Sequence, residues 1–114
     1  MTFITSEQAN NGLRLGLNLN DTTDPNVQDL EDKVLQAQAI VLDYLKVSDP
    51  ADKGWTDGDH PLQIDSAMIL VIRCLLDDTE ESAAFLGGLQ GRSEGDVRNP
   101  IVALLWRLRD PALA

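Results

Sequence analysis

His60 is the only histidine in the 114-residue sequence, and it closely follows two aspartates, Asp57 and Asp59. A divalent ion accepts carboxylates and imidazoles as ligands, and any small metal-dependent or hydrolytic enzyme here would depend on these residues. The nearby aspartates do not follow the alternate spacing of a calcium-binding loop, and no glutamate closes one. A turn at Gly58, with Asp59 or His60 capping a following helix, explains the same residues without a ligand. The sequence favours this structural interpretation, so we expect no metal ion and no cofactor.

The other residues with possible catalytic chemistry have structural explanations. Residues 87–93 are rich in glycine, but they lack the Gly-Lys-Ser/Thr ending and the preceding strand of a phosphate-binding loop. Cys74 is the only cysteine and lies in an apolar run, which indicates an inert buried thiol and allows no intrachain disulfide. The paired acids at 77–78 and 80–81 are adjacent, so on a helix the two side chains of a pair diverge by about 100°. These observations predict that the protein is not an enzyme.

A different set of residues is suited to binding a partner. Trp55 is a large aromatic in a polar loop, where it is either folded back on the core or displayed to a partner. Trp106 lies beside Arg107 and Arg109 and outside the leucine stripe of the last helix, which makes it a candidate docking element; alternatively, the arginines only complement the negative end of that helix. The candidate interface residues are Trp55, Arg92, Arg98, Trp106, Arg107 and Arg109.

The charge of the chain limits its partners. Nineteen acidic and nine basic residues give a formal net charge of -10, which repels phosphate backbones and anionic membranes. We therefore expect no sequence-specific DNA binding. An acidic surface would let DNA slide past without sticking, although it more often only keeps a protein in solution. The N-terminus lacks the features of a signal peptide and no window approaches the roughly 20 apolar residues of a membrane span, so an intracellular or particle-packaged protein is expected.

Periodicity predicts the elements that position these residues within one domain, 1–114. Thr5 or Ser6 can cap a first helix that runs to about Leu13. Alternating leucines over 13–20 then predict an extended segment, which must lie along helices or pair with another subunit. Asp24 followed by Pro25 predicts the start of a long amphipathic helix. Its expected apolar stripe is Val27, Leu30, Val34, Ala37, Val41 and Tyr44, with an Asp29–Lys33 pair on its outer face.

The second half of the chain is expected to add a central apolar helix and shorter elements. The apolar helix opens at Pro61 and ends near Leu76, and Asp78 with Glu81 caps a short helix that reaches Leu86. Residues 87–98, with glycines at 87, 88, 91 and 95, are expected to form a flexible glycine-rich arm that also carries Arg92 and Arg98. Asn99-Pro100 starts a last helix, striped by Ile101, Leu104, Leu105 and Leu108 and ended by Asp110-Pro111. The expected fold is therefore an all-α bundle of about four helices.

Four segments, taken in order, resemble the head-tail connector (adaptor) proteins of lambda-like siphophages, related prophages and gene transfer agents. A threonine-capped first helix leads to a leucine-arginine-leucine run, and a long amphipathic helix, a proline-started apolar helix and a late Ala-Leu-Leu-Trp-Arg helix follow. These segments are 4–9 with 13–15, 24–44, 61–70 and 99–108. Residues 77–81 are acidic, whereas members of that family often have aromatic and basic residues there.

The resemblance implies a structural virion protein at the head-tail junction, assembled in the host cytoplasm. In that family about a dozen copies form a ring that docks on the portal protein after DNA packaging. The C-terminal region would engage the portal, loops would meet neighbouring copies, and a stopper or tail-completion protein would bind below. DNA would pass through the channel without sequence-specific binding, and no membrane is involved. The alternative is a small acidic helical protein-interaction module, regulatory or antitoxin-like.

Overall fold

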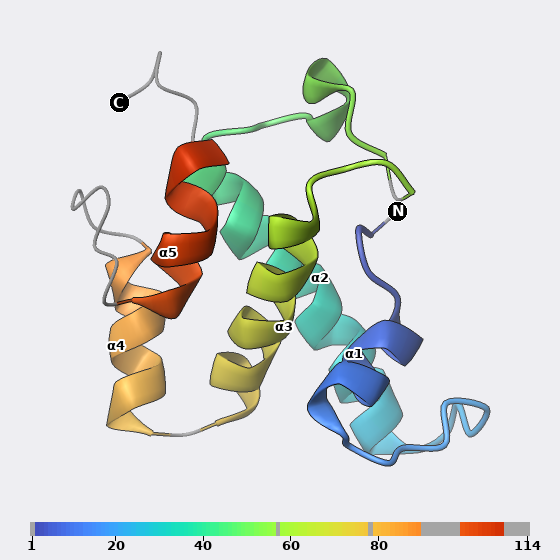
Figure 1. Ribbon diagram of the computed structural model, residues 1–114. Coiled ribbons are helices and arrows are strands. Elements are labelled where there is room, and N and C mark those ends of the chain that lie inside the picture. The colour runs from blue at the N-terminus through green and yellow to red at the C-terminus, as the bar shows by residue number, and fades with distance from the viewer. Residues whose placement is uncertain (1, 57, 78, 90–98, 109–114) are drawn as a thin grey trace.

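The computed structural model describes residues 2–56, 58–77, 79–89 and 99–108. These residues form five α-helices and two short 3-10 helices without a strand, so the all-α prediction is confirmed. Helix α3 lies in the middle, with α1 on one side and α4 and α5 on the other, while the long α2 crosses behind it (Figure 1). In chain order the elements are α1 (Ser6–Leu13), α2 (Pro25–Leu45), η1 (Pro50–Lys53), α3 (Leu62–Leu76), α4 (Glu80–Gly88), α5 (Pro100–Leu105) and η2 (Trp106–Leu108).

Helix α2 follows its sequence pattern closely. The Asp24 side chain accepts a hydrogen bond from the Asn26 backbone N–H at 2.9 Å, and Pro25 occupies the first turn. All six residues of the predicted apolar stripe are buried. Lys33 and Asp29 form the expected ion pair at 3.2 Å. The helix ends at Lys46, whose backbone is left-handed with a φ of 62°.

Helix α3 is the centre of the core, as its apolar composition predicted. It packs against α2, α1, α4 and α5. Its fully buried residues, among them Ile64, Met68 and Ile72, share one face of the helix, and the partly buried Ile69 and Leu70 pack against the core from outside that face. Its start differs from the expectation, because Pro61 is the N-cap residue and no side chain caps the helix. The prediction that Asp59 or His60 caps this helix is therefore wrong. The helix ends at Leu76 as expected.

The segment after α1 is not continuously extended, although its alternating leucines predicted an extended segment. Arg14 and Gly16 both have a left-handed backbone, with φ of 56° and 69°, so the chain turns. The buried Asn10 side chain forms two hydrogen bonds of 3.0 Å with the backbone N–H and C=O of Leu17, which takes the place of a partner strand. Leu17 and Leu19 thereby pack against the core, whereas Leu15 remains exposed. The segment thus lies along the helices of its own chain.

Helix α4 starts and ends at other residues than predicted. The Thr79 hydroxyl accepts a hydrogen bond from the Ser82 backbone N–H, so Thr79 caps the helix in place of the expected Asp78, which lies outside the described residues. The helix continues through Gly87 to Gly88, so these two glycines do not belong to a loop. The remainder of the predicted arm, 90–98, lies outside the described residues.

Asn99 joins α4 to α5. Its side-chain oxygen accepts a hydrogen bond from the Ile101 backbone N–H at 3.0 Å and caps α5, as predicted. Its side-chain NH₂ donates to the Phe85 carbonyl at 2.8 Å. Gly88 is needed here, because a Cβ atom at Gly88 would lie 2.8 Å from the Asn99 amide nitrogen. The predicted end of the last helix, Asp110-Pro111, lies outside the described residues. Within the described part, no helix has the length and apolar character needed to cross a bilayer.

Candidate functional site

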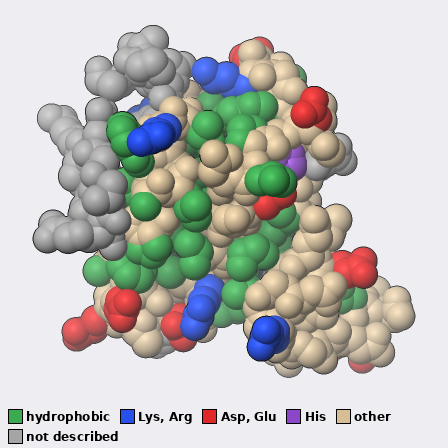
Figure 2. Space-filling view, viewed as in Figure 1, with side chains coloured by type: hydrophobic (Ala, Val, Ile, Leu, Met, Phe, Trp, Pro, Cys, Tyr) green, Lys and Arg blue, Asp and Glu red, His purple; other side chains and the backbone are tan. Residues whose placement is uncertain are grey.

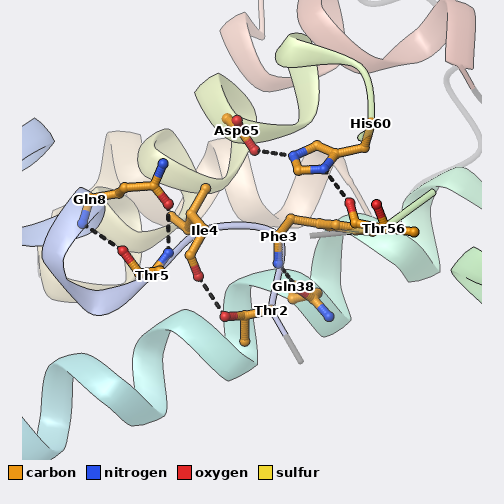
Figure 3. A network of polar contacts seen from close by, with 9 residues as sticks. All are labelled: Thr2, Phe3, Ile4, Thr5, Gln8, Gln38, Thr56, His60 and Asp65. Atoms are coloured by element: carbon orange, nitrogen blue, oxygen red, sulfur yellow. Dashed lines mark hydrogen bonds and ion pairs between the residues drawn. The ribbon is translucent and has the colours of Figure 1, made fainter. Parts of the chain in front are cut away.

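His60 is held by both of its ring nitrogens (Figure 3). Nδ1 lies 2.6 Å from the Thr56 carbonyl oxygen, and Nε2 lies 2.5 Å from Oδ1 of Asp65 on α3. A carbonyl oxygen and a carboxylate can only accept hydrogen bonds, so both ring nitrogens must donate. The arrangement therefore favours a positively charged imidazolium that pairs with the carboxylate of Asp65.

The surroundings of His60 explain its protonation. Burial of the ring lowers the pKa of His60, but the hydrogen bond to Asp65 opposes it, together with the Thr56 carbonyl and the charges of Asp65 and Asp59. The net result is a pKa raised above the ordinary value. The Phe3 ring lies against the imidazole, with 4.6 Å between the ring centroids. His60 therefore connects the N-terminal segment, the loop before α3 and α3 itself.

This geometry leaves His60 poorly suited to catalysis or metal binding. Both ring nitrogens are already engaged, and the side chain is only 5% exposed, so neither a substrate nor an ion has direct access to a free lone pair. Asp57, the third member of the candidate metal site, lies outside the described residues. Within the described part, no three His, Cys, Asp or Glu side chains are grouped as metal ligands. The arrangement acts as a structural clamp.

Trp55 belongs to the same corner of the molecule. It is half-buried, packs against the core, and meets the Phe3 ring edge-on at a centroid distance of 6.4 Å. Of the two arrangements that the sequence allows, this is the folded-back one. The Phe3 backbone N–H donates a hydrogen bond of 2.7 Å to the Gln38 side chain on α2, which fixes the ring that Trp55 contacts.

Trp106 is placed differently, at the end of α5. It is 39% exposed, and the guanidinium carbon of Arg107 lies 5.4 Å from its ring centroid. This is a cation–π arrangement, which keeps both side chains together at the surface. The other basic candidates, Arg92, Arg98 and Arg109, lie outside the described residues. The structure thus brings Trp106 and Arg107 together, on a different element from Trp55.

One surface feature was not predicted from the sequence. A hollow of about 460 Å³ lies between the end of α1 and the end of α3. Its lining residues are Gly12, Leu13, Arg14, Leu15, Arg73, Leu76 and Asp77. Gly12 allows the close approach of the two helices, since a Cβ atom there would lie 3.2 Å from the Ile69 side chain. The only sequence signal was an arginine in each of two otherwise apolar stretches.

A second hollow of about 360 Å³ lies between α3, α4 and the start of α5. Cys74 lines it together with Ser82 and Phe85. Burial raises the pKa of the Cys74 thiol, and a hydrogen bond from Ser82 only partly offsets this effect. A thiol with a raised pKa is a poor nucleophile at neutral pH, so this hollow has no evident chemistry.

Comparisons with known proteins do not assign the chain, because no protein-family model, no curated protein and no solved structure matches it. A proposal of function therefore depends on the residues described above and on the order of the sequence motifs.

Proposed function

We propose that this chain is a structural assembly protein, and specifically a ring-forming adaptor that docks on a phage portal after DNA packaging and joins capsid to tail. The observation that carries the proposal is the exposed pair of Trp106 and Arg107 at the end of α5. Tryptophan and arginine are the residue types most enriched among those that dominate binding energy. The buried and saturated environment of His60, by contrast, offers no open catalytic group.

The charge of the molecule supports the same proposal. A net charge of -10 suits a ring whose channel the genome passes without sequence-specific binding. On this proposal the C-terminal region contacts the portal, about a dozen copies surround the channel, and a stopper or tail-completion protein binds below. The protein would then reside at the head-tail junction of the virion.

The experiment is mass measurement and negative-stain microscopy of the purified protein, alone and mixed with the portal protein encoded near it. A variant that combines Trp106→Ala with Arg107→Glu should lose portal binding by at least about tenfold, because it removes the aromatic anchor and reverses its charge. Its helix content, measured by circular dichroism, should not change.

The matched control combines Leu62→Ala with Lys46→Glu, which removes another exposed apolar side chain and reverses another exposed charge. This control should bind the portal like the unmodified protein. A chain that stays monomeric and ignores the portal would contradict the proposal. That outcome favours the alternative, a small acidic interaction module of a regulatory or antitoxin-like kind.

A further inference from the structure

We propose that the hollow between α1 and α3 is a docking site for the outer face of α2 from a second copy of this chain. The inference rests on the proposed function for its setting, because it names a contact by which neighbouring copies in a ring would meet. The hollow is defined by Arg14 and Leu15 after α1 and by Arg73 and Leu76 near the end of α3.

The hollow carries an unusual charge for this molecule. Arg14 and Arg73 both line it, and among the described residues Asp77 is the one acidic residue that lines it with them. Neither arginine side chain forms an ion pair or a hydrogen bond with any residue in the part of the chain that the structure describes. On a chain with twice as many acidic as basic residues, two unpaired guanidinium groups at one hollow form a site suited to carboxylates.

Leucine side chains line the hollow beside the two arginines. Leu15 and Leu76 are 37% and 40% exposed, and both also line a smaller adjoining hollow of about 160 Å³ beside the start of α2. Figure 2 shows hydrophobic side chains gathered along the middle of one face, with both basic and acidic side chains along its lower edge. The site therefore suits a segment that presents an apolar side chain next to carboxylates.

The backbone of Arg14 gives an independent observation. Arg14 is the C-cap residue of α1 and has a left-handed backbone with a φ of 56°. Glycine is the usual residue at such a position, because a side chain there is strained. The Arg14 backbone N–H caps the end of α1, but its side chain makes no hydrogen bond or ion pair within the described residues. A side chain kept at a strained position without a partner in its own chain is consistent with a role in binding.

The outer face of α2 has the complementary chemistry. Leu35 is 58% exposed, and Glu31 and Asp32 lie four and three residues before it, so the three side chains share one face of the helix. Both acids are exposed, and neither pairs with a cation within the described part of the chain. An exposed leucine flanked by two carboxylates matches a hollow of exposed leucines flanked by two guanidinium groups.

A single copy cannot make this contact with itself. Helix α2 is packed through its buried stripe against α1 and α3, so Leu35 faces away from the core that carries the hollow. A contact between two different surfaces of identical copies is heterologous, and it adds copies until the rotation closes a ring. The unlike surfaces also let attraction between arginines and carboxylates oppose the repulsion between acidic copies.

The first test is sedimentation velocity over a range of concentrations, alone and with the portal. Arg14→Gly should weaken association between copies by at least about tenfold, because it removes one charge-assisted contact. The same change should not lower the midpoint of thermal unfolding, since glycine relieves the left-handed strain. Lys46→Gly is the matched control, because Lys46 also ends a helix with a left-handed backbone, at a φ of 62°. Lys46→Gly should leave association unchanged.

The second test is complementation. One variant carries Arg14→Gly and Arg73→Glu and keeps its α2 face; the other carries Glu31→Gln and Leu35→Gln and keeps its hollow. Each should be monomeric alone, and an equal mixture should form a one-to-one heterodimer and nothing larger. The inference would be overturned if the mixture contained only separate monomers. It would also be overturned if each variant, measured alone, associated as the unmodified chain does.

Disulfide trapping gives a readout that does not depend on stable assembly. On a Cys74→Ser background, copies with Leu15→Cys and copies with Leu35→Cys should cross-link, in solution or on the portal. Leu62→Cys in place of Leu35→Cys is the control, because Leu62 is 76% exposed and lies outside the α2 face. Equal cross-linking to both cysteines contradicts the contact. Portal binding without preferential cross-linking rejects only this inference, whereas cross-linking without portal binding rejects only the proposed function.

Discussion

The His60 corner and the hollow with Arg14 and Arg73 carry positive charge on an acidic chain in opposite ways. The imidazolium is buried, and both of its donors are already engaged by Thr56 and Asp65. The guanidinium groups are exposed and have no partner within the described part of the chain. A cation with all donors satisfied inside the fold contributes to stability, whereas one that is left unsatisfied at a surface is available to bind. Substitutions in the two regions should therefore change different measurements.

The largest effect is expected from His60→Ala. The change leaves the partly buried Asp65 carboxylate without its cation and opens a gap beside Phe3. Because removing one partner of a buried charged pair leaves the other uncompensated, unfolding free energy should fall by about 2–3 kcal/mol. Urea unfolding measures this loss. Under conditions where the variant is folded, association between copies should be unchanged. A His60→Ala variant that keeps its full stability but associates less would reverse the assignment of the two regions.

Asn10→Ala should have the next largest effect. The Asn10 side chain makes two hydrogen bonds to the Leu17 backbone, and their loss leaves a partly buried N–H and C=O without these partners. We expect a loss of about 1–2 kcal/mol in unfolding free energy. Hydrogen exchange at the Leu17 amide should accelerate more than exchange in α2. If the Leu17 amide keeps its protection in this variant, the two Asn10 hydrogen bonds are not what holds this segment in place.

The raised pKa of His60 also predicts a pH dependence. Because the folded-state pKa lies above the unfolded value of about 6.5, the protonated ring adds stability that is complete at lower pH. This contribution should decline as pH rises through the folded-state pKa. The difference in unfolding free energy between the natural chain and His60→Gln should therefore shrink as pH increases from 6 to 9. A constant difference would show that the ring does not change protonation in this range.

Local sequence signals predicted much of this fold, but they predicted little of the His60 corner or of the hollow with Arg14 and Arg73. The start of α2 follows from Asp24 and Pro25, and its buried stripe follows from spacing alone, because both are properties of neighbouring residues. The alternating leucines at 13–20 gave a wrong prediction of a continuously extended segment. The path of the chain there is set by the Asn10 side chain, which binds the Leu17 backbone, and by the left-handed backbone of Arg14.

The two regions depend on pairings across the chain that no local pattern reveals. Asp59 or His60 was expected to cap α3, but the Nε2 atom of His60 pairs with Asp65 one turn inside the helix and its ring packs on Phe3. Arg14 and Arg73 meet at one hollow only because α1 packs against α3. By contrast, Trp106 and Arg107 are adjacent in sequence, and their association at the surface was within reach of the sequence alone.

The smallest expected effect on stability separates the two regions most directly. Arg14→Gly replaces a strained left-handed residue by the one that tolerates this conformation best, although glycine also gains more freedom in the unfolded chain. The two terms leave a net gain of about 0.5 kcal/mol or less in unfolding free energy, and Lys46→Gly should behave alike. Paired urea titrations at one pH measure the difference. A loss of 1 kcal/mol or more for Arg14→Gly alone would mean that its side chain supports the fold, as His60 does, and is not held for a partner.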